Sequence, residues 1–391
     1  MNGSFSFRPV GHGLFYTGNI KYKDTGDVFN FIYDIGTLNS ETIIEKEVDK
    51  YCEKVKKIDF VILSHLDKDH VIGLFHLLDA KIEIDAIIMP YLNPTRLMFL
   101  FEESVLNIDG RKIKPNCKDK CRQYFEFLYK FYSDPYLYIK NKKNNCKIIL
   151  YSSAEISEIE TINGEQYNLE EINNIGDELL KSFQSSQYVI KKGGRNLFTV
   201  HPKTKTVISY KGWAFDIKQP GFNSLVKTRM DHIKQNLLDV LLSNVDKKEK
   251  ETILKEAKKY TNINNKDCIT LEHYPLNSVS GKDHTLLTGD YDDKEIYTKP
   301  TGLLSLGNEY YVIQIPHHGS KIKDSNLTIN SVTEYSVVCH RKDDPKHPNN
   351  QTKITYEQIS KNPIQHVTQN KNSYFEYDAT DKEMTVRHES Q

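Results

Sequence analysis

Several features that mark whole classes of protein are missing from this sequence of 391 residues. No apolar run approaches the roughly 18 residues that a membrane-spanning helix needs. Lys plus Arg (53) equals Asp plus Glu (53), so no net positive charge attracts the whole chain to nucleic acid or to anionic lipid. The opening residues, MNGSFSFRPV, contain neither a basic leader nor an apolar segment. We therefore expect a cytoplasmic protein without a membrane partner, in which any binding site for a polyanion is local.

Cysteine is sparse and irregularly spaced. The six cysteines form no CxxC pair, and Cys117 with Cys121 has no partner pair at the distance of a zinc ribbon. Nothing else in the sequence points to an oxidising compartment. We therefore expect reduced thiols and no disulfide scaffold.

Strand-like segments are concentrated at the two ends of the chain. IDFVILS (58–64) and IDAIIMP (84–90) are short apolar runs closed by polar residues or by proline, a pattern typical of strands buried on both faces. A helix-like segment, VIGLFHLL (71–78), separates them, which is the rhythm of a βαβ unit in a parallel or mixed sheet. We expect residues 1–95 and 266–391 to form the two parts of one layered α/β domain.

The middle of the chain, residues 96–265, lacks this rhythm, and we expect it to be a mixed, partly helical insertion. Apolar residues spaced three and four apart over 226–241 predict one amphipathic helix within it. Charge is segregated there, with 11 basic and 4 acidic residues over 106–150 (net +7), 8 acidic and no basic residues over 151–180 (net −8), and 11 basic and 2 acidic residues over 181–235 (net +9). The basic stretches are where a local electropositive surface is expected.

The densest group of candidate metal ligands follows the strand predicted at 58–64. The sequence SHLDKDH places four such side chains close together: His65, Asp67, Asp69 and His70. A loop at a strand end can bring them to one point, and imidazole and carboxylate both bind divalent metal. The alternative is a charged loop in which Asp67 and Asp69 face water.

Two weaker features also follow apolar strands. Asp290 comes after LLTG, which alone is ordinary turn chemistry. His317 and His318 come after IQIP and before Gly319, and such a pair can either bind a metal or cap the strand. Taken alone, each feature leaves both interpretations open.

Taken together and in order, these motifs resemble the metallo-β-lactamase fold, in particular the soluble hydrolase domain of ComEC-type DNA-uptake proteins. The resemblance is carried by PVGHG (9–13), YDIG (33–36), HLDKDH (65–70), LLTGD (286–290), PHHGS (316–320) and KHP (346–348). It implies an αββα four-layer sandwich with a large insertion, in which helices lie outside two mixed sheets. One or two metal ions would bind at the shared edge of the sheets.

The resemblance also implies which residues bind the metal: His65, Asp67, Asp69, His70, Asp290 and His317. His65 and Asp67 would face the first ion. Asp69 and His70 would face the second ion, and Asp290 would bridge the two. Of the adjacent histidines, His317 is favoured over His318 to complete the second site.

Other residues are implied to act beside the ions. Asp34 would support the ligands from behind, and His12 and Ser320 would contact the substrate or the ligands. In the reaction, Asp69 would orient the nucleophile, and His318, His347 or a lysine of the two basic stretches would supply a proton or a positive charge to the departing group.

Two departures from the family pattern bear on the identity of the metal. The second histidine of the family motif is Asp67 here. The histidine expected just before LLTGD is not apparent, although His273 and His284 lie nearby. A carboxylate-rich cluster favours harder ions, so the expected cofactor is one or two divalent ions, zinc or manganese.

These expectations indicate a hydrolase that uses a metal-activated hydroxide, and first of all a phosphodiesterase or nuclease whose partner is nucleic acid or a nucleotide. Aromatic residues among the lysines of 118–140 would either stack on unpaired bases or pack a helix against the sheets. One alternative is hydrolysis of a small ester, lactone, amide or nucleotide signal. Another is a metal-stabilised sensor module without catalysis, which the departure at Asp67 keeps open.

Overall fold

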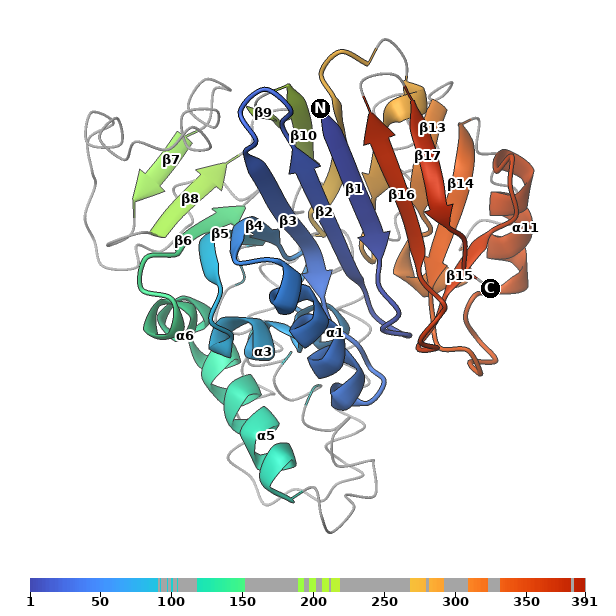
Figure 1. Cartoon of the computed structure of the whole chain (residues 1–391). Coiled ribbons are helices and arrows are strands. Elements are labelled where there is room, and N and C mark those ends of the chain that lie inside the picture. The colour runs from blue at the N-terminus through green and yellow to red at the C-terminus, as the bar shows by residue number, and fades with distance from the viewer. Residues whose placement is uncertain are drawn as a thin grey trace.

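Two mixed β-sheets and a few helices make up the described part of the chain, which is therefore a mixed α/β protein (Figure 1). The structure is a computed structural model. It describes residues 1–90, 118–151, 189–192, 197–201, 206–210, 212–218, 268–278, 281–291, 309–322, 331–380 and 383–390, together with residues 92, 97, 100 and 104.

The first sheet has ten strands in the order β17-β16-β1-β2-β3-β4-β5-β6-β8-β7. They are β1 (Asn2–Phe7), β2 (Phe15–Lys21), β3 (Val28–Ile35), β4 (Lys57–Ile62), β5 (Glu83–Pro90), β6 (Lys147–Tyr151), β7 (Val189–Lys192), β8 (Leu197–His201), β16 (Phe375–Thr380) and β17 (Met384–His388). The strands from β3 through β8 in this order are parallel, and the other pairs are antiparallel. Because β1 pairs with β16, strands from both ends of the chain lie side by side in this sheet (Figure 1).

The second sheet has seven strands in the order β15-β14-β13-β12-β11-β10-β9. They are β9 (Thr206–Tyr210), β10 (Trp213–Lys218), β11 (Thr270–Pro275), β12 (Thr285–Leu287), β13 (Glu309–Gln314), β14 (Val332–Cys339) and β15 (Gln365–Val367). The strands from β12 to β15 are parallel, and those from β9 to β12 are antiparallel. Each sheet therefore has a parallel half whose strand ends point the same way.

The strands predicted from the two apolar runs are confirmed as β4 and β5, which pair in parallel. The range 96–265 supplies strands to both sheets, because β6, β7 and β8 lie in the first sheet and β9 and β10 in the second. These strands are parts of the sheets themselves. The helix predicted over 226–241 lies outside the described residues, and the domain boundaries stay a prediction.

Side chains of the strands alternate between separate hydrophobic cores. In β4, Phe60 and Ile62 belong to the core between the two sheets, whereas Val61 belongs to the core on the outer face of the first sheet. That outer core also contains side chains of α1 (Glu41–Lys54), α3 (Leu74–Asp79), α5 (Lys118–Ser133) and α6 (Pro135–Lys142). A third core joins β13 and β14 to α11 (Asn350–Ile359). Helices thus pack against both sheets, α1, α3, α5 and α6 on one and α11 on the other (Figure 1).

Most described aromatic residues of α5 and α6 pack inward. Five of them are buried, four in α5 and one in α6, and all belong to the outer core of the first sheet: Tyr124, Phe127, Phe131, Tyr132 and Tyr138. Tyr129, by contrast, is 56% exposed. These five side chains therefore pack the helices against the sheet, as one of the two interpretations expected.

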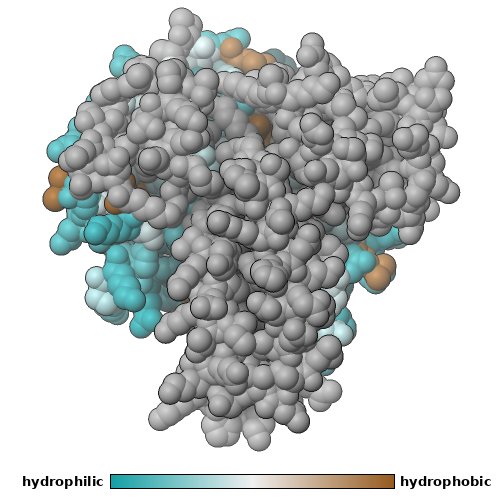
Figure 2. Space-filling model, turned by 180° about the vertical axis from the view of Figure 1, so that it is seen from behind, coloured by the Kyte–Doolittle hydropathy of each residue, from teal (hydrophilic) through white to brown (hydrophobic). Residues whose placement is uncertain are grey.

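The described residues that are visible on one face of the molecule are mainly polar (Figure 2). On the face shown in Figure 2, the coloured atoms are mostly hydrophilic, with a few separate hydrophobic groups. None of the helices described is both long enough and apolar enough to cross a membrane.

Candidate metal centre

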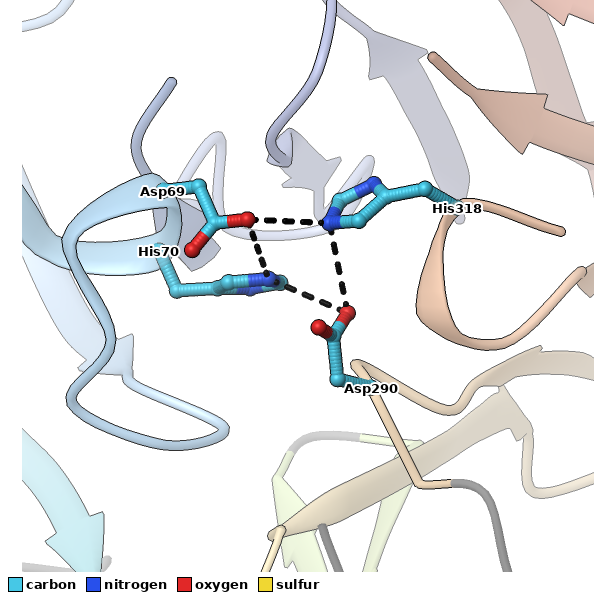
Figure 3. Close-up of side chains that lie close together, drawn as sticks. All are labelled: Asp69, His70, Asp290 and His318. Carbon is cyan, nitrogen blue, oxygen red and sulfur yellow. Dashed lines mark hydrogen bonds and ion pairs between the residues drawn. The ribbon is translucent and has the colours of Figure 1, made fainter. Parts of the chain in front are cut away.

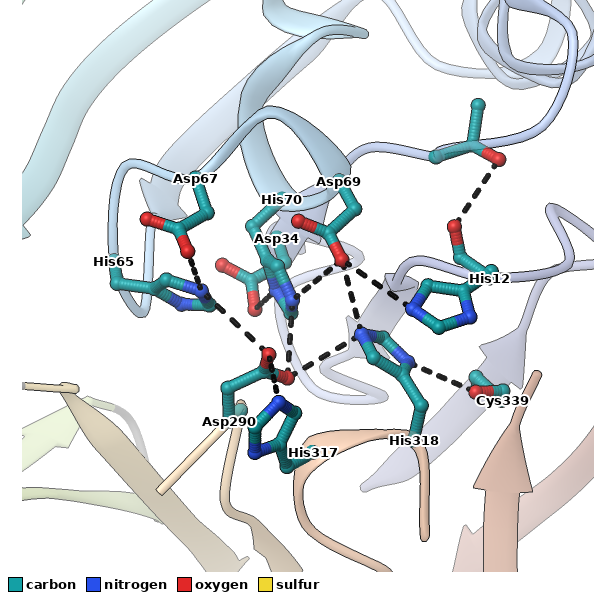
Figure 4. A network of polar contacts seen from close by, with 12 residues as sticks. His12, Asp34, His65, Asp67, Asp69, His70, Asp290, His317, His318 and Cys339 are labelled. Carbon is teal, nitrogen blue, oxygen red and sulfur yellow. Dashed lines mark hydrogen bonds and ion pairs between the residues drawn. The ribbon is translucent and has the colours of Figure 1, made fainter. Parts of the chain in front are cut away.

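Residues at the ends of strands from both sheets converge on one place (Figure 4). Asp34 lies near the end of β3, the 64–70 loop follows β4, and Asp290 follows β12. The turn η6 (His317–Gly319) follows β13. Because the carboxyl ends of parallel strands meet at one edge of a sheet, the two parallel halves bring these segments together.

Glycines allow the segments to approach closely. The segment 64–70 ends in α2 (Lys68–Val71), one helical turn that carries Asp69 and His70. A Cβ atom at Gly36 would lie 2.3 Å from the backbone oxygen of Asp69. Gly289 has φ +56°, and a Cβ atom there would lie 2.7 Å from the Oγ atom of Ser64. The glycines of the YDIG and LLTGD motifs are therefore needed for the site to close.

Two histidines and two aspartates form a buried group, Asp69, His70, Asp290 and His318, which we call the four-residue group (Figure 3). The Nε2 atom of His70 lies 3.1 Å from Oδ1 of Asp290. The Nε2 atom of His318 lies 3.2 Å from Oδ2 of Asp69 and 3.4 Å from Oδ1 of Asp290. One atom from each side chain lies within 4.8 Å of all the others, a spacing that one metal ion can bridge.

A second group, His65, Asp67 and Asp69, adjoins the first. The Nε2 atom of His65 lies 3.7 Å from Oδ2 of Asp67 and 3.8 Å from Oδ2 of Asp290. The two groups thus share Asp69, and the two oxygens of Asp290 face different groups. This is the arrangement expected of a bridging carboxylate between two ions.

The tautomers of His70 and His318 follow from their outer contacts. The Nδ1 atom of His70 donates to Oδ2 of Asp34 at 2.7 Å, and Nδ1 of His318 donates to the backbone oxygen of Cys339 at 2.9 Å. Carboxylate and carbonyl oxygens only accept, so Nδ1 carries the proton in each ring. The Nε2 atoms are left facing the four-residue group, as in histidines that bind a metal.

His65 is oriented through a hydroxyl group. Ser64 Oγ donates its single proton to Oδ2 of Asp34 at 2.6 Å, so it can only accept from His65 Nδ1, which lies 2.8 Å away. Asp34 also accepts from the backbone N–H of Ser64 at 2.6 Å. One buried carboxylate therefore fixes the inward direction of two histidines (Figure 4).

The donor atoms of both groups fit a divalent cation. Three of the buried side-chain atoms that form no hydrogen bond within the described part of the chain face the groups: His65 Nε2, His70 Nε2 and Asp290 Oδ1. Buried polar atoms that form no hydrogen bond are costly, and a cation bound between the groups would contact all three atoms. The set contains nitrogen and oxygen but no sulfur, which suits zinc or manganese.

Neighbouring charges reinforce one another at this site. Burial alone would lower the pKa of His70, but the carboxylates of Asp290, Asp34 and Asp69 raise it well above its ordinary value. Burial alone would raise the pKa of Asp290, but its neighbouring histidines hold it well below. Burial, assisted by the adjacent His70, lowers the pKa of His65 to about 3. Asp69 and Asp290 therefore stay ionised and His65 stays neutral, which are the forms that bind metal, whereas His70 would have to release a proton on binding it.

The adjacent histidines of η6 differ in position. His318 belongs to the four-residue group, although the sequence favoured His317 as the ligand. The side chain of His317 is 33% exposed, and its Nε2 atom lies 3.8 Å from Oδ2 of Asp290. The geometry therefore favours His318 as the ligand and leaves His317 at the edge of the site.

The remaining predicted residues lie next to the four-residue group. The ring of His12 lies against that of His318, with centroids 4.3 Å apart and ring planes inclined by 37°. Ser320 Oγ lies 3.0 Å from Nε2 of His347. Neither Ser320 nor His347 belongs to the four-residue group, and both lie on the side of His12.

Asp344 is a residue of this region that the sequence analysis missed. Its Oδ2 atom lies 3.2 Å from Nδ1 of His347 and 3.5 Å from Nδ1 of His12. Its position three residues before His347 was the only signal available. The histidines considered for the missing ligand lie elsewhere, because His273 is buried against Tyr16 and His284 contacts Glu272.

No protein-family model matches the chain, and no curated protein is significantly similar to it. The function proposed below therefore rests on the geometry of the site and on the resemblance of the motifs.

Proposed function

We propose that the chain is a metal-dependent hydrolase of the metallo-β-lactamase type that cleaves phosphodiester bonds. The observation that carries the proposal is the four-residue group, in which His70 and His318 direct Nε2 toward two ionised aspartates. The αββα architecture is supported by the three hydrophobic cores, one between the sheets and one on the helix side of each sheet.

The two groups would hold one or two divalent ions, zinc or manganese. His65 and Asp67 would hold one ion, and Asp69, His70 and His318 the other. Asp290 would bind between them through its two oxygens. Ions bound there would supply Lewis acidity that polarises the scissile group and lowers the pKa of water.

Side chains beside the groups would handle the substrate and its protons. Asp69 would orient the attacking nucleophile. His347 Nε2 and Ser320 Oγ, which lie 3.0 Å apart, form a pair through which a proton can pass to the departing oxygen. His318, the other histidine considered for this step, belongs with the ligands instead. Phosphodiester as the substrate class is supported by the resemblance to DNA-uptake hydrolases, and the basic stretches 106–150 and 181–235 offer positive charge for a polyanion.

The test is cleavage of labelled single-stranded and double-stranded DNA and RNA by chelator-treated protein, to which Mn²⁺, Mg²⁺ or Zn²⁺ is returned. We expect metal-restored cleavage, and a loss of about 100-fold or more in Asp69→Ala with the fold intact, because removing only an outer partner of a ligand already costs about 10–100-fold. Asp24→Ala, which changes an exposed carboxylate, is the matched control.

Wild-type activity in Asp69→Ala would contradict the metal mechanism. Metal binding without any cleavage of nucleic acid would point to a small ester, lactone, amide or nucleotide substrate. A chain that binds metal and hydrolyses none of these would be a sensor module.

A further inference from the structure

Beside the four-residue group lies another set of potential ligands, His12, Asp344 and His347, which we call the rim group. These residues come from the loop between β1 and β2 and from the loop between β14 and α11. Their side chains are only partly buried, with 16%, 18% and 20% exposed, respectively. Asp67, Asp69, Asp290 and the inward histidines take no part in this group, so it is a separate candidate site.

Each residue of the rim group is positioned by a contact with a residue outside the group. Asp344 Oδ1 accepts from the backbone N–H of Lys346 at 2.8 Å, which turns Oδ2 toward the two histidines. His347 Nε2 lies against Ser320 Oγ, so its Nδ1 atom faces Asp344. The backbone N–H of His12 donates to Asn39 Oδ1 at 2.8 Å, which fixes the loop that carries the ring. These contacts keep Oδ2 of Asp344 and Nδ1 of His347 facing each other and position the loop that carries His12.

The spacing of these three atoms suits a metal ion. Ligands bound about 2.1 Å from an ion lie about 3.0–3.5 Å from one another in octahedral or tetrahedral geometry. Asp344 Oδ2 lies 3.2 Å from Nδ1 of His347 and 3.5 Å from Nδ1 of His12, and each of the three side chains offers a ligand atom within 4.8 Å of the others. Neither ring nitrogen of His12 makes a hydrogen bond to the described residues. Its Nδ1 atom, 3.5 Å from Oδ2 of Asp344, is therefore available to bind an ion together with that oxygen.

We propose that the rim group binds a divalent transition-metal ion of its own, through Nδ1 of His12, Oδ2 of Asp344 and Nδ1 of His347. Two imidazoles and one carboxylate leave further coordination positions open on the ion. Because the group is partly exposed, these positions are accessible to an anionic oxygen, such as that of a phosphate. His12 Nε2 lies 3.9 Å from Oδ2 of Asp69, so the ion would lie next to the main centre. This inference does not depend on the proposed hydrolase activity.

The test is the number of zinc ions bound per chain after equilibrium dialysis of the full chain against Zn²⁺ alone, measured by elemental analysis. We expect Asp344→Asn to bind one zinc ion fewer than the wild type. Asp343→Asn is the matched control, because it removes the same charge from the neighbouring exposed residue, and it should keep the wild-type number. His12→Gln should lose the same single ion, which separates loss of the site from misfolding of the 341–349 loop.

Equal zinc content in Asp344→Asn and Asp343→Asn would overturn the rim site, as would a wild-type chain that binds no zinc. Asp290→Asn distinguishes the rim site from the main centre, because it changes the residue proposed to bind between the two main groups and leaves the rim group complete. A zinc ion that remains in Asp290→Asn and is lost in the double variant Asp290→Asn/Asp344→Asn would support the rim site even if no nuclease activity is found.

Discussion

The Nδ1 atom of His70 lies 2.7 Å from Oδ2 of Asp34, and both side chains are completely buried. The same oxygen of Asp34 accepts from Ser64 Oγ, which in turn contacts His65. Asp34 therefore belongs to neither of the two groups of candidate ligands, yet it orients one histidine in each of them. Partners of this kind tune the affinity of a metal centre almost as strongly as the ligands themselves.

Asp34→Asn should weaken metal binding by about 10–100-fold without unfolding the chain. Asparagine can still accept the backbone N–H of Ser64, but its NH₂ group cannot accept from both Ser64 Oγ and His70 Nδ1. Residue 34 has φ 56°, a conformation that asparagine tolerates, so the backbone can be kept. Calorimetric titration of chelator-treated protein with Mn²⁺ or Zn²⁺ measures the change. Exposed Asp24→Asn serves as the control, and unchanged affinity in Asp34→Asn would remove the orienting role.

The adjacent histidines of η6 should behave differently when each is replaced by alanine. His318→Ala removes a proposed ligand whose side chain is 1% exposed, and we expect a loss of metal affinity greater than the roughly 100-fold upper value for an outer partner. His317 makes a partly exposed contact with Asp290. Such contacts are worth about 0–1 kcal/mol, so His317→Ala should change the affinity by at most about fivefold. The same titrations decide between them, and a larger loss in His317→Ala would reverse our assignment.

Local signals in the sequence predicted the parts of the site that depend on neighbouring residues. An apolar run predicts β4, and the polar loop after it contains four candidate ligands because a strand end presents its loop at the sheet edge. The choice between His317 and His318 is different. Both follow the same strand, and the choice depends on a turn with φ of 49° and 53°, which adjacent identical residues do not reveal.

Contacts between segments that are distant along the chain could not be predicted from the sequence. Asp344 faces His12 across more than 300 positions of the chain, because the loops after β1 and β14 meet only in the folded sheets. Likewise, β10 lies inside the range predicted as an insertion. Its place in the second sheet depends on pairing with β11 across residues that carry no recognisable motif.

Phe215→Ala tests whether β10 is part of the central core. The Phe215 ring is fully buried and lies 5.2 Å from the ring of Phe31 and 5.0 Å from that of Phe60. Truncating a buried phenylalanine costs about 3–5 kcal/mol of unfolding free energy. Tyr129→Ala, at a residue that is 56% exposed, should change it by no more than about 0.5 kcal/mol. Urea unfolding measures both, and a small effect of Phe215→Ala would remove β10 from the core.

A buried histidine away from the candidate metal centre should make the fold sensitive to acid. His273 is fully buried, and burial, followed by the neighbouring His284, lowers its pKa to about 3. In the unfolded chain its pKa is about 6.5, so below that pH the unfolded state takes up a proton that the folded state refuses. Its contribution to stability is therefore present above pH 6.5 and is lost progressively as the pH falls from about 6.5 toward 3, by up to about 1.4 kcal/mol per pH unit.

His273→Gln keeps a polar group near Tyr16 but does not titrate. In chelator, urea unfolding at pH 7.5 and 5.5 should show a loss of unfolding free energy about 1.4 kcal/mol smaller in His273→Gln than in the wild type, and equal losses would mean that His273 is protonated in the folded state.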